Sequence, residues 1–203
     1  MTRLDSKLRT LGIAARLTLV LTVVLGVLYP LLITAVGQLA LESHANGSLV
    51  RDRAGGVVGS RLIGQSFTDA DGKPLPQYFQ SRPSAAGDGY DPTASGGSNL
   101  GPESARLIEA IRERKRAIAA FNRVPPSAVP PDAITASGSG LDPDVSPAYA
   151  AIQIERVARA RALDPATVRR LVAAHTHGPD LGFLGEPRVN VLTLNLALDQ
   201  LSP

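Results

Sequence analysis

Two neighbouring histidines, His175 and His177, are of a type and spacing that could bind a metal ion. Side chains two residues apart point to different sides of a helix, and no cysteine or third nearby histidine completes a ligand set. Asp180 is the only carboxylate close by in the sequence. The pair favours a helix C-terminus, where histidine suits the helix dipole, and a metal site is the alternative. We therefore assign no metal ligands.

Two glycine-rich segments, residues 95–101 and 137–140, are of the kind that can surround a phosphate group with backbone N–H groups. Neither segment continues into Gly-Lys-Ser or Gly-Lys-Thr, and no strong strand pattern leads into either of them. We therefore expect tight turns at both segments, with a phosphate site as the alternative.

Catalytic chemistry has few other starting points in this chain. No Gly-x-Ser-x-Gly motif is present, and His44 is the only histidine besides the pair, so Ser-His-Asp triads are few. The carboxylates are scattered, and no glycosidase pair can be chosen among them. The absence of cysteine excludes thiol catalysis, disulfide bonds and a lipoprotein anchor. We predict that the chain is not itself an enzyme.

The element that must position everything else is an uncharged run from Leu17 to Leu41. As a helix it measures roughly 37 Å, enough to cross a hydrocarbon core of about 30 Å with some tilt. A helix satisfies its own backbone hydrogen bonds in lipid, so we expect one transmembrane helix at 17–41. A buried soluble helix is the alternative. The predicted domains are a cytoplasmic tail at 1–16, this helix, and an extracytoplasmic domain at 42–203.

One face of this helix is unusual, because Gly26, Pro30, Thr34 and Gln38 recur every four residues. Pro30 presses on the carbonyl of Gly26, so we expect a kink there. Small residues allow close helix approach, and Gln38 prefers a hydrogen-bond partner to lipid. We therefore predict that this face packs against other membrane helices. A tolerated proline and a glutamine near the interface are the alternative.

Charge sets the expected orientation. The tail carries a net +3 from Arg3, Lys7, Arg9 and Arg16 against Asp5, and the whole chain also carries +3. The part after the helix is therefore neutral, which argues against a nucleic-acid-binding surface. Positive charge beside the first span keeps that end in the cytoplasm. We expect a single-pass protein of the plasma membrane (the inner membrane in a cell with two), with its C-terminal domain outside.

A cleaved signal peptide is the rival interpretation of the N-terminal region. Ser43-His44-Ala45 has the small-x-small pattern of a cleavage site. The apolar region of a signal peptide usually covers about 7–15 residues, however, which is shorter than this run.

The region after the helix predicts a mixed α/β (α+β) domain. Apolar clusters between glycines and prolines favour short strands near 57–63, at 78–80, at 134–137 and just before Asn190. Proline and cap residues favour helices at 102–122, from 147 to about 163 after Ser146, from 165 to about 175 after Asp164, and after Asn190. The C-terminal leucines also alternate as in a strand, so a longer strand there is the alternative. A turn is expected at 71–74, an irregular loop at 81–101 and an extended connector at 125–131.

Several motifs in order resemble the C subunit of the Kdp-type potassium-transporting ATPase. They are Tyr29-Pro30-Leu31 with Thr34, Arg82-Pro83-Ser84, Ser95-Gly96-Gly97-Ser98-Asn99-Leu100-Gly101-Pro102, Ser137-Gly138-Ser139-Gly140-Leu141-Asp142-Pro143, and the segment from Phe183 to Leu192. The resemblance extends from the helix to near the C-terminus.

The resemblance implies a non-catalytic subunit of an ATP-driven, high-affinity potassium uptake complex. Its partners are a channel-like potassium-binding subunit and a P-type ATPase subunit, within membrane lipid and without nucleic acid. It implies that the chain assembles the complex and acts as a catalytic chaperone that raises the ATP affinity of the ATPase subunit. ATP and potassium are then ligands of the complex, and this chain binds no cofactor firmly.

The resemblance also implies a nucleotide-related role for Gln153. The predicted topology opposes this role, because it places Gln153 outside the cell whereas ATP is cytoplasmic. A helix-surface or packing residue is therefore the preferred interpretation of Gln153. The alternative function for the whole chain is a stand-alone, membrane-tethered extracytoplasmic binding or sensor domain.

Overall fold

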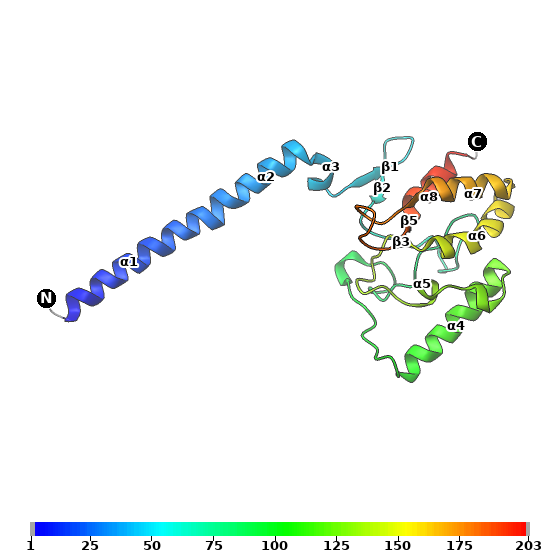
Figure 1. Cartoon of the computed structure of the whole chain (residues 1–203), viewed down its shortest axis with the longest axis horizontal. Coiled ribbons are helices and arrows are strands. Elements are labelled where there is room, and N and C mark those ends of the chain that lie inside the picture. The colour runs from blue at the N-terminus through cyan, green and yellow to red at the C-terminus, as the bar shows by residue number, and fades with distance from the viewer. Residues whose placement is uncertain (1–2, 202–203) are drawn as a thin grey trace. The chain divides into compact units, whose positions relative to one another are not determined.

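The chain forms two compact units, which divide between Ser48 and Leu49 (Figure 1). The computed structural model describes residues 3–201, with side chains from residue 7 onward. The first unit is helical, and the second combines helices with short strands. This confirms the predicted fold class, an N-terminal helix able to cross a membrane followed by a mixed α/β domain.

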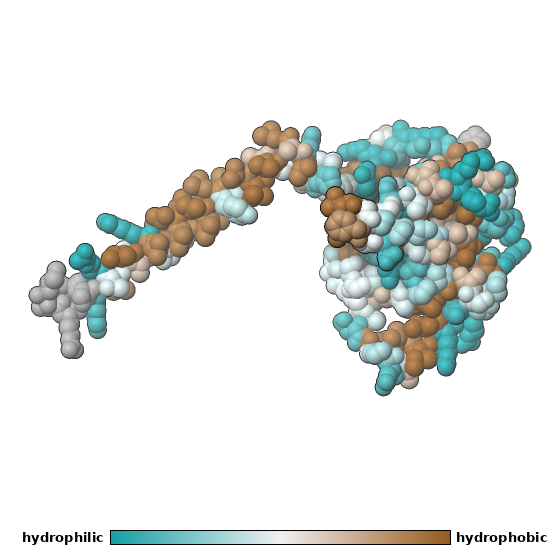
Figure 2. All heavy atoms as spheres, in the orientation of Figure 1, coloured by the Kyte–Doolittle hydropathy of each residue, from teal (hydrophilic) through white to brown (hydrophobic). Residues whose placement is uncertain are grey.

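The first unit is dominated by one long helix. It comprises α1 (Arg3–Val23), a π-helical turn (η1, Val24–Leu28) and α2 (Tyr29–Ala40). Within residues 3–201, Lys7–Ala40 is the one helix that is long and apolar enough to span a membrane, and none of its apolar window is buried. On the face drawn in Figure 2 most of this segment is apolar, and hydrophilic side chains gather near its N-terminal end. The helix also includes most of the segment predicted as a tail, and the short α3 (Glu42–Ala45) follows it.

The second unit contains two small antiparallel sheets and several helices. In the first sheet, β1 (Leu49–Arg51) pairs with β2 (Val57–Ser60); the second has the order β3 (Asp144–Val145), β5 (Arg188–Asn190), β4 (Thr176–His177). The helices are α4 (Ala105–Asn122), α5 (Pro131–Ile134), α6 (Pro147–Ala160), α7 (Pro165–Ala174) and α8 (Val191–Asp199). Single 3₁₀ turns occur at Pro92–Ala94 and Pro126–Ala128.

Three helices begin at the predicted cap residues. The side chains of Ser146, Asp164 and Asn190 accept hydrogen bonds from backbone N–H groups at the starts of α6, α7 and α8, at 3.0, 3.1 and 3.1 Å. Such a cap typically stabilises a helix by about 1 kcal/mol. The C-terminal segment is therefore a short strand followed by a helix, as predicted.

The core of the second unit lies between α6, α7, α8 and β5. Its fully buried apolar side chains come from these elements, from α5 and from one extended segment: Phe79, Ala133, Ala150, Val157, Val168, Val189, Leu194 and Leu198. The amphipathic helices and the central strand of the second sheet thus form one contiguous core.

Several predicted elements are wrong in detail. Residues 134–137 are not a strand, because Pro131 starts the short helix α5, which the Thr135 hydroxyl closes by donating to the Pro131 carbonyl. The connector at 125–131 includes a 3₁₀ turn. Helix α4 starts at Ala105 rather than Pro102, because the preceding residues form a turn in which Ser104 N–H donates to the Gly101 carbonyl at 3.0 Å.

The strand boundaries also differ from the prediction. Strand β2 ends at Ser60, whose hydroxyl accepts a hydrogen bond from Leu62 N–H, so residues 62–63 lie in a turn. Strand β1 lies in a segment for which no strand was predicted. Residues 78–80 were predicted as a strand but form none, because side chains rather than a neighbouring strand bind their backbone.

Candidate functional site

The extended segment at 78–80 is held by two buried side-chain amides instead of a neighbouring strand. Gln153 of α6 accepts from Gln80 N–H at 2.7 Å and donates to the Gln80 carbonyl at 3.2 Å. Asn195 of α8 does the same for Phe79, at 2.9 and 3.0 Å. Each amide supplies the donor and acceptor that a paired strand would supply. The segment therefore has a strand-like sequence but belongs to no sheet.

Arg156 completes this arrangement from the next turn of α6. It is 4% exposed and donates to the Tyr78 carbonyl at 2.9 Å, to Gln153 Oε1 at 2.7 Å and to Asn122 Oδ1 at 2.9 Å. Its guanidinium lies 4.4 Å from the ring centre of Phe121. Burial lowers the pKa of Arg156 to about 10, so the side chain stays charged at neutral pH. Neutral oxygens and an aromatic face thus stabilise a cation inside the core.

The structure places Gln153 where its amide is fully used. The residue is 0% exposed, and both polar atoms of its side chain are hydrogen-bonded to Gln80 or Arg156. Direct contact between this amide and a nucleotide requires these bonds to open. Its nucleotide-related role stays a prediction.

The two glycine-rich segments lie against each other. Gly96 N–H and the Ser95 hydroxyl both donate to the Ser139 carbonyl, at 2.8 and 2.9 Å. A Cβ atom at Gly140 would lie 2.7 Å from the Gly96 carbonyl oxygen, and Gly140 also has a φ of +69°. Glycine is therefore required there for close approach of two backbones and for a left-handed turn.

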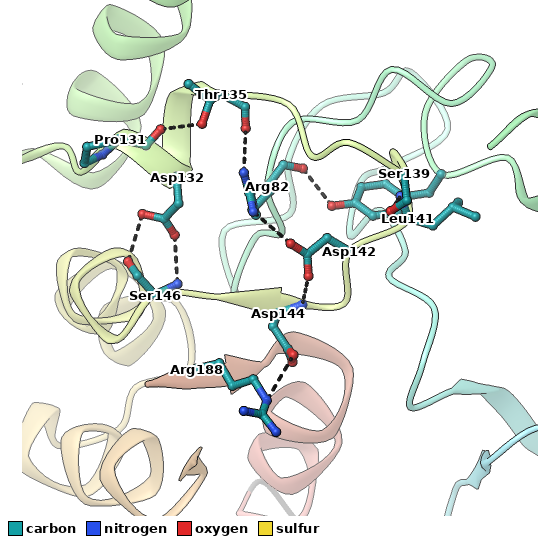
Figure 3. A network of polar contacts seen from close by, with 11 residues as sticks. Arg82, Pro131, Asp132, Thr135, Ser139, Leu141, Asp142, Asp144, Ser146 and Arg188 are labelled. Carbon is teal, nitrogen blue, oxygen red and sulfur yellow. Dashed lines mark hydrogen bonds and ion pairs between the residues drawn. The ribbon is translucent and has the colours of Figure 1, made fainter. Parts of the chain in front are cut away.

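A polar network joins four segments that are far apart in the sequence (Figure 3). Arg82 Nη1 donates to Asp142 Oδ2 at 2.8 Å, and Arg188 Nε lies 3.6 Å from Asp144 Oδ2. Asp132 accepts from both the backbone N–H and the hydroxyl of Ser146, at 2.8 Å each. All five of these charged side chains border one open cavity of about 710 Å³.

Within this network, Asp144 has a perturbed acidity. Burial raises its pKa above the ordinary value of 3.8, the hydrogen bond from Asn190 lowers it, and nearby Asp142 raises it further. The opposite charges of the network lie close enough to balance one another. The hydrogen bonds and ion pairs of this network hold the loops around β3 and β5 in place. Sequence reasoning missed it, and the only available signals were Arg82-Pro83-Ser84 and Leu141-Asp142-Pro143.

The two histidines considered as metal ligands occupy different elements. His175 is the C-cap residue of α7, with Nδ1 2.9 Å from the Leu171 carbonyl oxygen, and His177 lies in β4. Within residues 3–201, no group of three or more histidine, aspartate or glutamate side chains is arranged to hold a metal ion.

The predicted partner face of the long helix is exposed on the first unit. A Cβ atom at Gly26 would meet only the Thr22 side chain, at 3.9 Å. The π-helical turn lies just before Pro30, with Tyr29 N–H donating to the Val24 carbonyl, so the irregularity expected near proline takes this form. The Gln38 amide exchanges two hydrogen bonds of 3.3 Å with Asn46. Contact of Gly26, Pro30, Thr34 and Gln38 with other membrane helices stays a prediction.

Comparisons with known proteins agree over nearly the whole chain. The family model described as "KdpC: K+-transporting ATPase, c chain" matches residues 11–200. The potassium-transporting ATPase KdpC subunit of Kineococcus radiotolerans is 56% identical over 200 residues, covering 98% of this chain and 98% of that protein. The subunit of the same name from Gemmatimonas aurantiaca is 56% identical over 187 residues, covering 92% and 90%. That of Mycobacterium tuberculosis is 51% identical over 189 residues, covering 93% and 96%.

Proposed function

The chain belongs to the KdpC family, the c chain of K+-transporting ATPases, and from this we propose that it assembles and stabilises an ATP-driven, high-affinity potassium uptake complex. The observation that carries the proposal is the 56% identity over 98% of both chains, a match long enough to include the apolar helix and nearly all of the second unit. As a KdpC protein, the chain is an accessory subunit of the transporting ATPase and not its hydrolase.

The proposed partners are the channel-like, potassium-binding subunit and the P-type ATPase subunit of the same complex. We place the chain in the plasma membrane as a single-pass protein, with its N-terminus in the cytoplasm and residues after about 42 outside. Lys7, Arg9 and Arg16 support this orientation, because positive charge beside a first span stays on the cytoplasmic side. The exposed apolar surface of Lys7–Ala40 supports contact with lipid and with membrane helices of the partners.

The proposed effect on ATP is indirect. The chain raises the affinity of the ATPase subunit for ATP through the assembled membrane helices, without forming the nucleotide site itself. Two points support this route: the Gln153 amide is enclosed in the core, and the proposed topology separates the second unit from cytoplasmic ATP. ATP and potassium are accordingly ligands of the other subunits, and this chain holds neither firmly.

The experiment compares the complex assembled with and without this chain. We expect the chain to raise the yield of intact complex and to lower the ATP concentration needed for half-maximal potassium-stimulated hydrolysis. Equal yield and equal ATP dependence without the chain contradict the proposal. That result favours the rival function, a membrane-tethered binding or sensor domain that works alone.

A further inference from the structure

The hairpin loop at 178–187, which joins β4 to β5, carries an exposed apolar tip. Leu181 is 83% exposed and Phe183 is 74% exposed, the highest values among large apolar side chains described in the second unit, and Leu184 is 50% exposed. The loop closes an antiparallel strand pair in which His177 lies opposite Arg188. These side chains contribute almost nothing to the core, so burial within the domain does not account for them.

The loop is held in one conformation in spite of its exposure. Asp180 and Leu184 exchange backbone hydrogen bonds at 2.8 and 2.9 Å, and Gly182 N–H donates to the Pro179 carbonyl at 3.0 Å. At its base, Arg188 Nη2 donates to both carboxylate oxygens of Asp180, at 3.0 and 3.2 Å. A tip ordered in this way loses little conformational freedom on binding, as a preorganised contact surface requires.

Backbone geometry does not account for Leu181 either. Its φ is +55°, in the left-handed region that disfavours a leucine and suits glycine or asparagine. The domain thus holds an exposed leucine in a strained conformation. The turn that Gly182 N–H closes with the Pro179 carbonyl uses this φ, but it does not require a leucine side chain, whose unfavourable placement points to a functional surface.

We propose that the tip of loop 178–187 docks into an apolar pocket with a basic rim on the extracytoplasmic face of a partner subunit. The proposal rests on the function proposed above. Leu181 and Phe183 enter the pocket, and the acidic side chain of Glu186 faces its rim. Glu186 makes no ion pair with any residue in the described range, so its charge is available for this contact.

The charge of the loop favours a protein partner over a lipid surface. Residues 178–187 contain two carboxylates and no lysine, arginine, tryptophan or tyrosine. Loops that enter a membrane interface typically carry amphipathic aromatic residues and basic residues free to meet headgroups, whereas the flanking Arg188 is already paired with Asp180 and Asp144, and anionic headgroups repel the carboxylate of Glu186. A pocket bordered by cations instead complements the loop in both shape and sign.

Photo-crosslinking in the full complex tests the contact directly. A photoreactive phenylalanine analogue is placed at Phe183, and in a control chain at Leu62, which is 60% exposed but lies outside the loop. We expect position 183 to form a covalent product with another subunit and position 62 to form none. Products with lipid alone, or no product from position 183 in an intact complex, overturn the proposal.

Substitution provides a second readout. The double variant L181N/F183S should lower retention of the full chain by its partners about tenfold or more, the scale expected for truncated anchor residues. The matched variant L62N/I108S, which also removes two exposed apolar side chains, should leave retention unchanged. The single variant L181N should lower retention while keeping or raising the thermal midpoint, because asparagine tolerates the left-handed conformation.

The outcomes separate the two proposals. Full retention of L181N/F183S in a complex that forms with the wild-type chain overturns the docking role and leaves the proposed function standing. If the wild-type chain itself fails to co-purify with any partner, the proposed function fails and the docking role fails with it. A lowered thermal midpoint for L181N also counts against the proposal, because it makes Leu181 a structural residue.

Discussion

At the residue scale, two side-chain amides make the backbone hydrogen bonds that a neighbouring strand usually makes. Gln153 and Asn195 each pair with the N–H and C=O of one residue in the segment at 78–80. The segment lies 73 residues before Gln153 and 116 before Asn195. Because backbone polar groups in a core must be paired, these two amides let Phe79 enter the core without a neighbouring strand.

The first prediction concerns Gln153. Gln153→Leu keeps most of the side-chain volume but leaves Gln80 N–H and the Gln80 carbonyl without partners. We expect a loss of about 3 kcal/mol in the free energy of unfolding, because each buried unpaired group costs roughly 1–3 kcal/mol. The measurement is denaturant unfolding of the full chain in detergent.

Glu155→Ala is the matched control on the same helix. Glu155 is exposed, and its ion pair with Arg169 is 3.4 Å long. Such pairs contribute little, so a change within about 0.5 kcal/mol is expected. If the Gln153 variant is as stable as this control, the amide does not hold the segment as described. A confirmed loss means that any defect in ATP affinity seen at Gln153 must first be corrected for folding.

The second prediction concerns Asp144 and pH. Burial raises the pKa of this carboxyl above its ordinary 3.8, so the folded domain binds the proton more readily than the unfolded chain does. Stability is therefore lost as pH rises from about 4 through the folded-state pKa, and Asp144→Asn removes this loss. We expect the variant to gain more stability over wild type at about pH 7 than at about pH 4. The measurement is the thermal unfolding midpoint of the variant and of wild type at both pH values. A difference between the two proteins that is equal at both pH values, or larger at the lower one, contradicts the expectation.

At the element scale, local signals identified the longer helices and two of the strands, β2 and β5, but missed the others. Ser146, Asp164 and Asn190 cap α6, α7 and α8 as predicted, because a cap depends on residues within one turn. Strands β3 and β4 have two residues each, which is too short for an alternating pattern to indicate them.

The parts of the candidate site that the sequence did not predict depend on contacts between residues that are far apart in the chain. Gln153 could be placed on a helix, but its burial depends on a distant partner, Gln80, that no local pattern reveals. The network of Arg82, Asp142 and Arg188 likewise joins segments that only the tertiary fold brings together. The apolar tip overlaps, from Phe183 onward, a motif that was used for family resemblance, and its exposure became apparent only from the structure.

The third prediction concerns the long helix as an assembly element. Gly26→Leu combined with Gln38→Leu should leave the chain inserted, since both changes increase hydrophobicity, but should weaken its retention by the other subunits. A bulky residue at Gly26 separates packed backbones, and a lost interhelical hydrogen bond costs on the order of 1 kcal/mol. Co-purification in mild detergent at equal expression measures the effect.

The control for the helix changes a residue on another side of it. Val36→Leu adds bulk at an exposed position that lies two residues from both Thr34 and Gln38. We expect little effect from this change. If Gly26→Leu with Gln38→Leu retains its partners as fully as the control does, the second unit alone holds the subunit in the complex, and Gln38 serves only its bond to Asn46.

At the scale of the whole molecule, the proposed orientation rests on charge. The N-terminal segment carries the net +3 of the chain, and the rest is neutral. The fourth prediction is therefore that a C-terminal reporter active only in the cytoplasm stays silent, while one active only outside gives a signal. The opposite pattern reverses the proposed topology and removes the second unit from the extracytoplasmic side.

The most direct measurement purifies the tagged full-length chain from membranes in mild detergent and identifies what elutes with it. We predict that the channel-like subunit and the P-type ATPase subunit co-elute, and that the eluate hydrolyses ATP when potassium is added. The chain produced without these partners should show no hydrolysis above a mock preparation. Elution of the chain alone from membranes that contain both partners, or ATP hydrolysis by the purified chain by itself, would contradict its role as an accessory subunit.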